Sequence, residues 1–136
     1  MSVPMTPARR VQVFVGETDH VAHKPRAQAI LEYLRREGAA GATVTRGVAG
    51  FGVHSRIHTA SILDLSADLP MVITWVDTRE HVDRLLPGVL ELAGSGIVTV
   101  EDVTVVGDPD AHLHRTRSAG PMSGITPPHP IDPETP

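Results

Sequence analysis

The order in which two apolar patterns follow one another along the first 106 residues is the feature that most constrains the fold. Some segments alternate with a period of two, as strands do, and others repeat apolar residues at i, i+3, i+4 and i+7, as helices do. Their order is strand, helix, strand, strand, helix, strand. This order predicts an α+β fold of the ferredoxin-like βαββαβ type, an antiparallel sheet with two helices on one face. The strands are expected at residues 10–16, 43–48, 71–76 and 97–106, and the helices at residues 25–38 and 77–90; residues 62–65 either continue the second strand or begin the return.

The two predicted helices carry their own start and stop signals. Pro25 suits the first turn of a helix, where its missing N–H is not needed, and Gly38 ends the first helix. Asp77, with Glu80 three residues later, forms a capping box at the start of the second helix. Pro87 interrupts the second helical pattern and removes a hydrogen bond, at a cost of about 3 kcal/mol. We therefore expect a kink, or two short helices, just before Pro87.

The sheet is expected to be apolar on both faces. Residues 71–76 carry large apolar side chains at both parities, and residues 97–106 likewise place valines on both sides. Two helices cover only one side of such a sheet. A bare apolar face would exceed the few hundred Å² that monomers usually expose, so the pattern favours self-association through the sheet.

The composition changes near residue 107 and divides the chain in two. Seven of the twelve prolines fall in the last 30 residues, where no apolar period is found. We therefore expect a folded domain at residues 8–106 and a Pro-rich disordered tail at residues 107–136.

Charge and residue usage exclude several classes of function. The formal net charge is −4 and only four residues are aromatic, which disfavours nucleic-acid binding. The N-terminus lacks an apolar signal core, and no apolar run approaches the ~18 residues that span a bilayer, so we expect a cytoplasmic protein with no membrane insertion. With no cysteine, disulfides, thiolate metal sites and cysteine nucleophiles are excluded.

A glycine-bearing segment after the second strand is the main candidate for a binding site. Gly47, Gly50 and Gly52 lie within six residues. Glycine permits positive φ and lets a ligand reach backbone N–H groups, as in many phosphate and carboxylate sites. Neither a G-x-G-x-x-G nor a G-x-x-x-x-G-K-[ST] motif is present, and a passive glycine-rich hairpin is the alternative.

Three cations are candidates to face this segment: Arg46, Arg56 and Lys24. A guanidinium can hold a phosphate through two hydrogen bonds, and the alternative for each residue is a solvated surface charge. His54 and His58 stand four residues apart, but no helix is indicated there, so no metal site is predicted.

Two carboxylates follow the first strand at the edge where a cleft would lie. Glu17 and Asp19 could hold Mg²⁺ or act as a general base. Turn chemistry, in which Thr18 and Asp19 satisfy the local backbone, is the favoured interpretation. No catalytic constellation emerges from the sequence, and we expect a protein that is not an enzyme.

Three segments give the chain a resemblance to a known family: residues 13–25, the long GATVTRGVAGFGVHSRIHTASILDLSADLP stretch at residues 41–70, and IVTVEDVTVV at residues 97–106. With the helices between them, they resemble the small PII-like signalling proteins, distant relatives of the nitrogen-regulatory PII proteins, over residues 9–106. The resemblance implies a homotrimer that holds an adenine nucleotide in clefts between subunits. It also implies a loop between the second and third strands that reports the ligand to a partner protein.

The resemblance also implies site residues. A G-x-T-V strand start that lines the adenine pocket in PII proteins corresponds to Gly41, Thr43 and Val44. The G-F-G at the loop base that faces the phosphates corresponds to Gly50, Phe51 and Gly52. The predicted nucleotide or anion site therefore comprises Gly41, Thr43, Val44, Arg46, Gly47, Gly50, Phe51, Gly52, Arg56 and Lys24.

Two departures from the PII pattern limit the size of the ligand. One extra residue separates the two motifs, and the loop before the last strand is only Gly94-Ser95-Gly96, without the G-D-G-K-I-F that grips ATP phosphates in PII proteins. We therefore expect AMP, ADP or another small anion as the ligand, and no covalent cofactor. By analogy alone, the unknown client protein could be a membrane transporter.

The sequence thus predicts a PII-like sensor with a ligand-responsive loop at residues 50–61. Two alternatives stay open. One is a slow metal-assisted nucleotide phosphohydrolase that uses Glu17 or Asp19, and the other is a CutA-type metal-binding trimer that uses His54 and His58.

Overall fold

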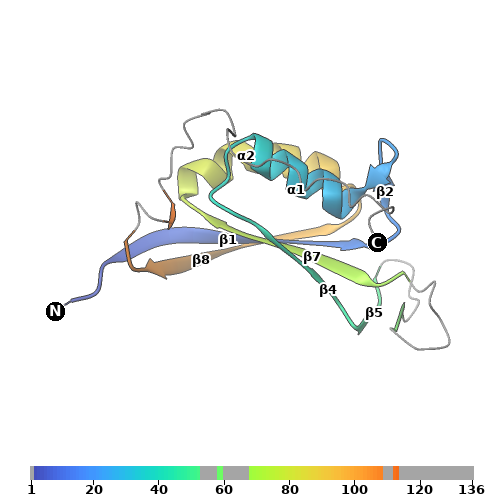
Figure 1. Ribbon diagram of the computed structural model, residues 1–136, viewed down its shortest axis with the longest axis horizontal. Helices are drawn as coiled ribbons and strands as arrows, with labels where there is room; N and C mark the ends of the chain where they lie inside the picture. Colours follow the sequence, from blue (N-terminus) through green and yellow to red (C-terminus); the bar gives the residue numbers. More distant parts are fainter. Residues whose placement is uncertain (1, 53–57, 60–67, 109–111, 114–136) are drawn as a thin grey trace, which may run out of the picture.

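The fold is a four-stranded antiparallel sheet with two helices packed on one face (Figure 1). The computed structural model describes residues 2–52, 58–59, 68–108 and 112–113. The strand order β4-β7-β1-β8 and the two helices confirm the ferredoxin-like prediction. The main elements are β1 (Met5–Gly16), α1 (Arg26–Arg36), β4 (Thr43–Arg46), β7 (Pro70–Asp77), α2 (Arg79–Ala93) and β8 (Ile97–Val106).

Strand β1 lies at the centre of the sheet and is longer than the sequence predicts. It pairs with β8 from Met5↔Val106 to Phe14↔Ile97, and with β7 from Arg9↔Asp77 to Gly16↔Pro70. Residues before Arg10 lack a clear alternation, and pairing with the long β8 extends the strand to Met5. Two short hairpins complete the described elements: β2 (His20–Val21) pairs with β3 (Lys24–Pro25), and β5 (Ala49–Gly50) pairs with β6 (His58–Thr59).

The core lies between the helices and one face of the sheet. Alternate residues of β1, among them Val11 and Val13, are buried against α1 and α2, together with Ile73 and Trp75 of β7. Each fully buried side chain of this size contributes about 1.5–3 kcal/mol. The helical period and the strand alternation therefore meet in one apolar layer.

The ends of the helices differ in one respect from the prediction. Helix α1 starts after Pro25 and is followed by Gly38 at φ +84°, as expected. The N-cap of α2 is Thr78, whose hydroxyl accepts a hydrogen bond from the His81 N–H at 3.2 Å. The predicted capping box at Asp77 is wrong, because that carboxylate is buried and used elsewhere.

Helix α2 continues through Pro87, so the prediction of two short helices is wrong. A Cβ at the neighbouring Gly88 would collide with the hydroxyl of Tyr33 from α1. The same Tyr33 hydroxyl donates to the carbonyl oxygen of Leu85 at 3.2 Å. The Pro87-Gly88 pair therefore marks the close approach of the two helices instead of a helix end.

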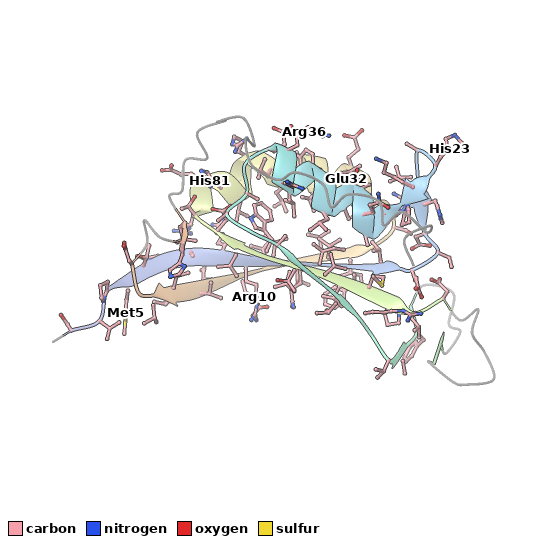
Figure 2. All side chains as sticks on the ribbon, in the orientation of Figure 1. Met5, Arg10, His23, Glu32, Arg36 and His81 are labelled. Carbon is pink, nitrogen blue, oxygen red and sulfur yellow. The ribbon has the colours of Figure 1, made fainter. Side chains whose placement is uncertain are left out.

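The sheet face opposite the helices is more polar than the sequence suggests. Arg10 points away from the helices (Figure 2), and its guanidinium pairs with Glu101 at 2.9 Å. Beside this pair, Gln12 Nε2 donates to Thr74 Oγ1 at 3.3 Å. The strand registers then place an apolar row at one end of this face, made of Ile97, Phe14 and Val72. Within the described residues, no helix is long and apolar enough to cross a membrane.

Candidate functional site

The glycine-bearing segment follows β4, which is an edge strand of the sheet. Among the described strands, β4 pairs with β7, from Thr43↔Thr74 to Arg46↔Met71. The pairing continues one residue further, since the Gly47 N–H donates to the Pro70 carbonyl oxygen at 2.7 Å. Figure 1 shows the end of β4 and β5 projecting beyond the rest of the sheet.

Gly47 and Gly50 allow the close approach of Pro70, and neither adopts a positive φ. A Cβ at Gly47 would lie 2.5 Å from Pro70 Cγ, and a Cβ at Gly50 would lie 2.9 Å from the same atom. In the described part of the chain, positive φ at glycine occurs at residues 38, 94 and 107, so these three glycines do not use the positive φ that glycine permits. Gly52 differs, because no atom of the described residues lies within 4 Å of its added Cβ. Among the atoms that the structure describes, Gly52 is the one of the three glycines with room for a ligand at its Cα.

Arg46, the predicted anion-binding cation, forms an exposed ion pair. Its Nη2 lies 3.0 Å from Glu17 Oε2, and both side chains are partly exposed. The Glu17 N–H donates to the Leu69 carbonyl oxygen at 2.8 Å, which fixes the turn after β1 beside the start of β7. The sequence offered no signal for this pair, because its two residues are 29 positions apart. An incoming anion would compete with Glu17 for Arg46.

Lys24 is directed toward α1 and not toward Arg46. Its Nζ lies 2.7 Å from Glu32 Oε2 on that helix. The hydrogen bond from Lys24, with a second from Gln28, lowers the pKa of the Glu32 carboxyl below its ordinary value. Lys24 and Arg46 thus pair with different carboxylates, Glu32 and Glu17.

Of the two carboxylates after β1, Asp19 stabilises the turn, as the favoured interpretation predicted, and Asp68 adds a second contact to the same turn. Asp19 Oδ2 accepts the Gly16 N–H at 2.9 Å, and Asp68 Oδ1 accepts the Thr18 N–H at 2.8 Å. In the part of the chain that the structure describes, no group of three His, Asp or Glu side chains could hold a metal ion.

Several predicted residues lie at or beyond the edge of the described chain. Arg56 and His54 fall outside the described residues, and His58 is placed only through the pairing of β6 with Gly50. Phe51 is described and is 75% exposed, close in sequence to Val48 at 78%. Two large apolar side chains thus project to solvent at the base of the loop.

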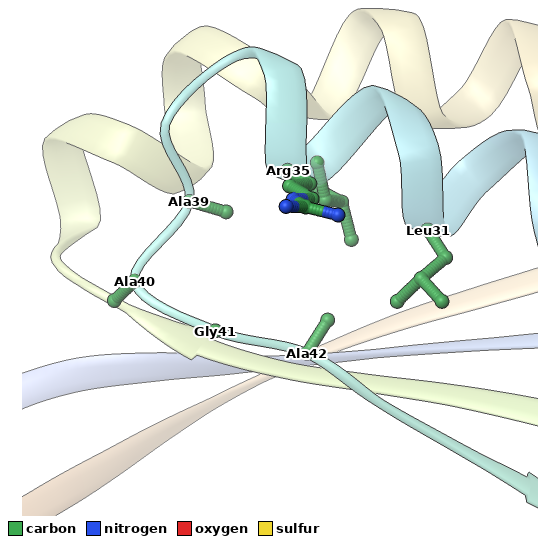
Figure 3. Close-up of a pocket in the computed structure, with 7 residues that line it drawn as sticks. Leu31, Arg35, Ala39, Ala40, Gly41 and Ala42 are labelled. Atoms are coloured by element: carbon green, nitrogen blue, oxygen red, sulfur yellow. The ribbon is translucent and has the colours of Figure 1, made fainter. Parts of the chain in front are cut away.

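A shallow hollow lies on the helix side of the residues that lead into β4 (Figure 3). It has a volume of about 250 Å³. Gly41 of the predicted adenine motif lines it. Val44 packs against the core instead, and Thr43, with its register partner Thr74, lies on the opposite face of the sheet. The sequence missed Arg35, whose side chain borders the hollow in Figure 3. The lining residues are Leu31, Leu34, Arg35, Ala39, Ala40, Gly41 and Ala42.

The comparison of sequences shows a family match across the folded part of the chain. Residues 8–105 match the protein family described as DUF190, Uncharacterized ACR. A UPF0166 protein of Methanocaldococcus jannaschii is 32% identical over 102 residues, which cover 74% of this chain and 94% of that protein.

The comparison of folds shows similarity to CPII, a nitrogen regulatory PII-like protein from Thiomonas intermedia K12. Its structure bound to ADP, AMP and bicarbonate has a TM-score of 0.63 and 24% identity, covering 82% of this chain and 99% of that one. Its structure bound to ADP and bicarbonate has a TM-score of 0.61 and 26% identity, with the same coverage. These matches confirm the resemblance to a PII-like family that the sequence indicated.

Proposed function

This chain belongs to the DUF190 family, and on that premise we propose that it is a PII-like regulatory protein that binds an AMP- or ADP-sized adenine nucleotide, or a related small anion. The similarity to CPII, which was crystallised with ADP, AMP and bicarbonate, supports the class of ligand. The short Gly94-Ser95-Gly96 loop argues against a triphosphate.

The arrangement at the end of β4 is the observation that carries the proposal. A half-exposed Arg46 guanidinium stands directly before the Gly47–Gly52 segment on an edge strand. Charge-assisted hydrogen bonds from a guanidinium are the usual means of holding a phosphate. Gly52 offers an unobstructed Cα at the same end of the strand. A phosphate or carboxylate bound here would replace Glu17 as the partner of Arg46.

The nucleotide cleft of the proposal is completed by other copies of the chain in a homotrimer. On the sheet face opposite the helices, Ile97 is 62% exposed beside Phe14 and Val72. This exposed apolar row favours a partner surface over the face.

The proposed signal is a change of order in the loop at residues 50–61, read by a client protein. The proposed sensor is the domain at residues 8–106, and residues 107–136 form the segment that follows it, of which Leu113 is buried. The exposed Val48 and Phe51 support a loop base that meets another surface. We propose regulation and not catalysis, because Glu17 and Asp19 are engaged by Arg46 and the turn backbone.

Isothermal titration calorimetry of the full chain with AMP, ADP, ATP and bicarbonate tests the ligand. We expect AMP or ADP to bind more tightly than ATP, and Arg46→Ala to weaken binding about 10- to 150-fold through loss of a charged hydrogen bond worth ~1.5–3 kcal/mol. Arg79→Ala is the matched control, since it removes an exposed guanidinium at the start of α2, outside β4 and the hollow. No heat with any of the four ligands would refute the proposal.

Light scattering tests the trimer through two matched substitutions on β7. Val72 belongs to the apolar row with Phe14 and Ile97, whereas Val76 lies next to Arg10 in the pairing register. Val72→Glu should break the assembly because it buries an unpaired charge, and Val76→Glu should be tolerated because Arg10 can pair with it. A wild-type monomer at micromolar concentration would contradict the trimer.

A further inference from the structure

A fully buried carboxylate lies at the end of β7 that is farther from the glycine segment. Asp77 has 0% relative exposure. Its Oδ1 accepts the Thr78 N–H at 2.8 Å and meets His81 Nδ1 at 2.8 Å. Its Oδ2 accepts the Trp75 Nε1–H at 2.9 Å and the Ala40 N–H at 2.9 Å. One side chain thus meets four donors and satisfies both of its oxygens.

The four donors come from three separate parts of the fold. Trp75 belongs to β7, and Thr78 and His81 belong to the first turn of α2, where Figure 2 shows His81. Ala40 lies in the connection between α1 and β4, outside any helix or strand. Asp77 therefore joins the start of α2 and the end of β7 to the backbone that leads into β4.

The segment that Asp77 holds, residues 39–42, leads directly into the proposed ligand site. Residues 39–42 form one wall of the hollow in Figure 3 and contain Gly41, the first residue of the predicted adenine motif. In the sheet of described strands, β4 lies at the edge with β7 as its neighbour, so less backbone hydrogen bonding fixes its start. A buried ionised acceptor is a strong anchor, because its hydrogen bonds are charge-assisted and shielded from water.

We propose that Asp77 is a positioning residue for the ligand site: through the Ala40 N–H it fixes the backbone of residues 39–42, and so the place of Gly41 and the start of β4. This inference rests on the function proposed above for its ligand, AMP or ADP. Asp77 itself is buried and does not touch the ligand. Its role is to restrict the conformations of residues 39–42 in the free protein, so that less conformational entropy is lost when the ligand binds.

Hydrogen exchange on the wild-type protein tests the anchor without any substitution. The Ala40 amide should exchange at least about 10-fold more slowly than in an unstructured chain, although it lies outside the helices and strands. Exchange of Ala40 at the unstructured rate would overturn the proposal.

Asp77→Asn then tests the consequence for binding. The amide nitrogen of asparagine is a donor, so at least one of the four N–H groups loses its acceptor. We expect faster exchange at residues 40–42 and a dissociation constant for ADP raised about 10-fold or more, measured well below the melting temperature. Binding as tight as in the wild type would overturn the proposal.

Two controls separate positioning from a general loss of stability. Val89→Ala removes buried volume further along α2. Measured at the same fraction of its own melting temperature as Asp77→Asn, it should leave Ala40 exchange and ADP binding within twofold of wild type. His81→Ala removes a donor from Oδ1 and should spare Ala40, which is bound to Oδ2. Losses in either control equal to those of Asp77→Asn would overturn the assignment.

The same experiments distinguish the two proposals. If the wild-type chain binds neither AMP nor ADP, the proposed function fails, and Ala40 exchange in the wild type and in Asp77→Asn still decides whether Asp77 fixes the segment. If ADP binds to wild type and Asp77→Asn alike, the function stands and the positioning role is refuted.

Discussion

The two ends of β7 are held in opposite ways. At one end the ring of Pro70 packs closely against the backbone of Gly47 and Gly50, and an exposed ion pair joins Arg46 to Glu17 nearby. At the other end Asp77 is fully buried and meets four donors. Exposed ion pairs contribute about 0–1 kcal/mol, whereas breaking a buried charged network costs several times more. The Asp77 end is therefore built to stay fixed, and the Pro70 end can exchange its polar contacts with a ligand.

The largest effect is expected from removing the buried carboxylate altogether. Asp77→Ala should destabilise the fold by about 3–5 kcal/mol, because four donors lose an acceptor in a site that water does not reach. Thermal unfolding followed by circular dichroism measures the loss. Asp68→Ala at the Pro70 end is the control and should cost far less, because its hydrogen bond to the Thr18 N–H is exposed. Equal losses would remove the contrast between the two ends.

A smaller loss of stability is expected from the packing at Pro70. Gly47→Ala forces a Cβ against Pro70 Cγ and should cost about 1–3 kcal/mol. Chemical denaturation should show that Pro70→Ala, by removing the ring, recovers part of that loss in the double variant. Gly52→Ala should be neutral, since its added Cβ meets nothing. A neutral Gly47→Ala would show that close approach to Pro70 is not why glycine stands there.

The chain beyond β8 leaves the sheet at the Asp77 end, and truncation there should give a moderate effect. Of the predicted tail, the structure describes residues 107–108 and 112–113, and Leu113 is 3% exposed. Deleting residues 114–136 should leave the melting temperature nearly unchanged. Deleting residues 108–136 should lower it, because up to about 1.5–3 kcal/mol of Leu113 burial is lost. Identical melting temperatures for both truncations would show that Leu113 contributes nothing to the core.

The smallest effect is expected at the exposed ion pair. Glu17→Gln removes the charge that competes for Arg46, so affinity for ADP should rise by a few fold while stability changes by less than about 1 kcal/mol. Calorimetry at low and at high salt measures the ADP affinity of the wild type and of Glu17→Gln. The gain in affinity of the variant should be smaller at high salt, because screening weakens the competition of Glu17 for Arg46. Weaker binding in Glu17→Gln would mean that Glu17 supports the site instead of competing for it.

Much of the fold could be predicted because it depends on local patterns. The 3.6-residue period placed α1 between Pro25 and Gly38, and the valine-rich alternation placed β8 at Ile97–Val106. The order of elements then allowed few topologies, and the observed sheet order follows it. The apolar periods fail where a distant partner decides the structure: pairing with β8 extends β1 to Met5, and Gly88 admits Tyr33 between the helices.

The candidate site was predictable in outline only. Arg46 ends a strand and the glycine segment follows it, as the sequence indicated, but the contact that occupies Arg46 comes from Glu17 in the turn after β1. The glycines were expected to provide positive φ and free N–H groups, and instead Gly47 and Gly50 accommodate Pro70. Their role depends on which strand lies beside them, and a glycine pattern does not encode that.

The sequence by itself determined the elements of this protein and their order, because hydrophobic periodicity and glycine and proline signals act within a few residues. Its resemblance to a PII-like family rested on three particular segments. Only the tertiary structure decided what its polar residues do. Asp77 has the sequence context of a helix cap, yet it became a buried acceptor because the fold brings Ala40, Trp75 and His81 around it. A carboxylate takes its role from the donors that surround it, and here those donors come from positions up to 37 residues away in the chain.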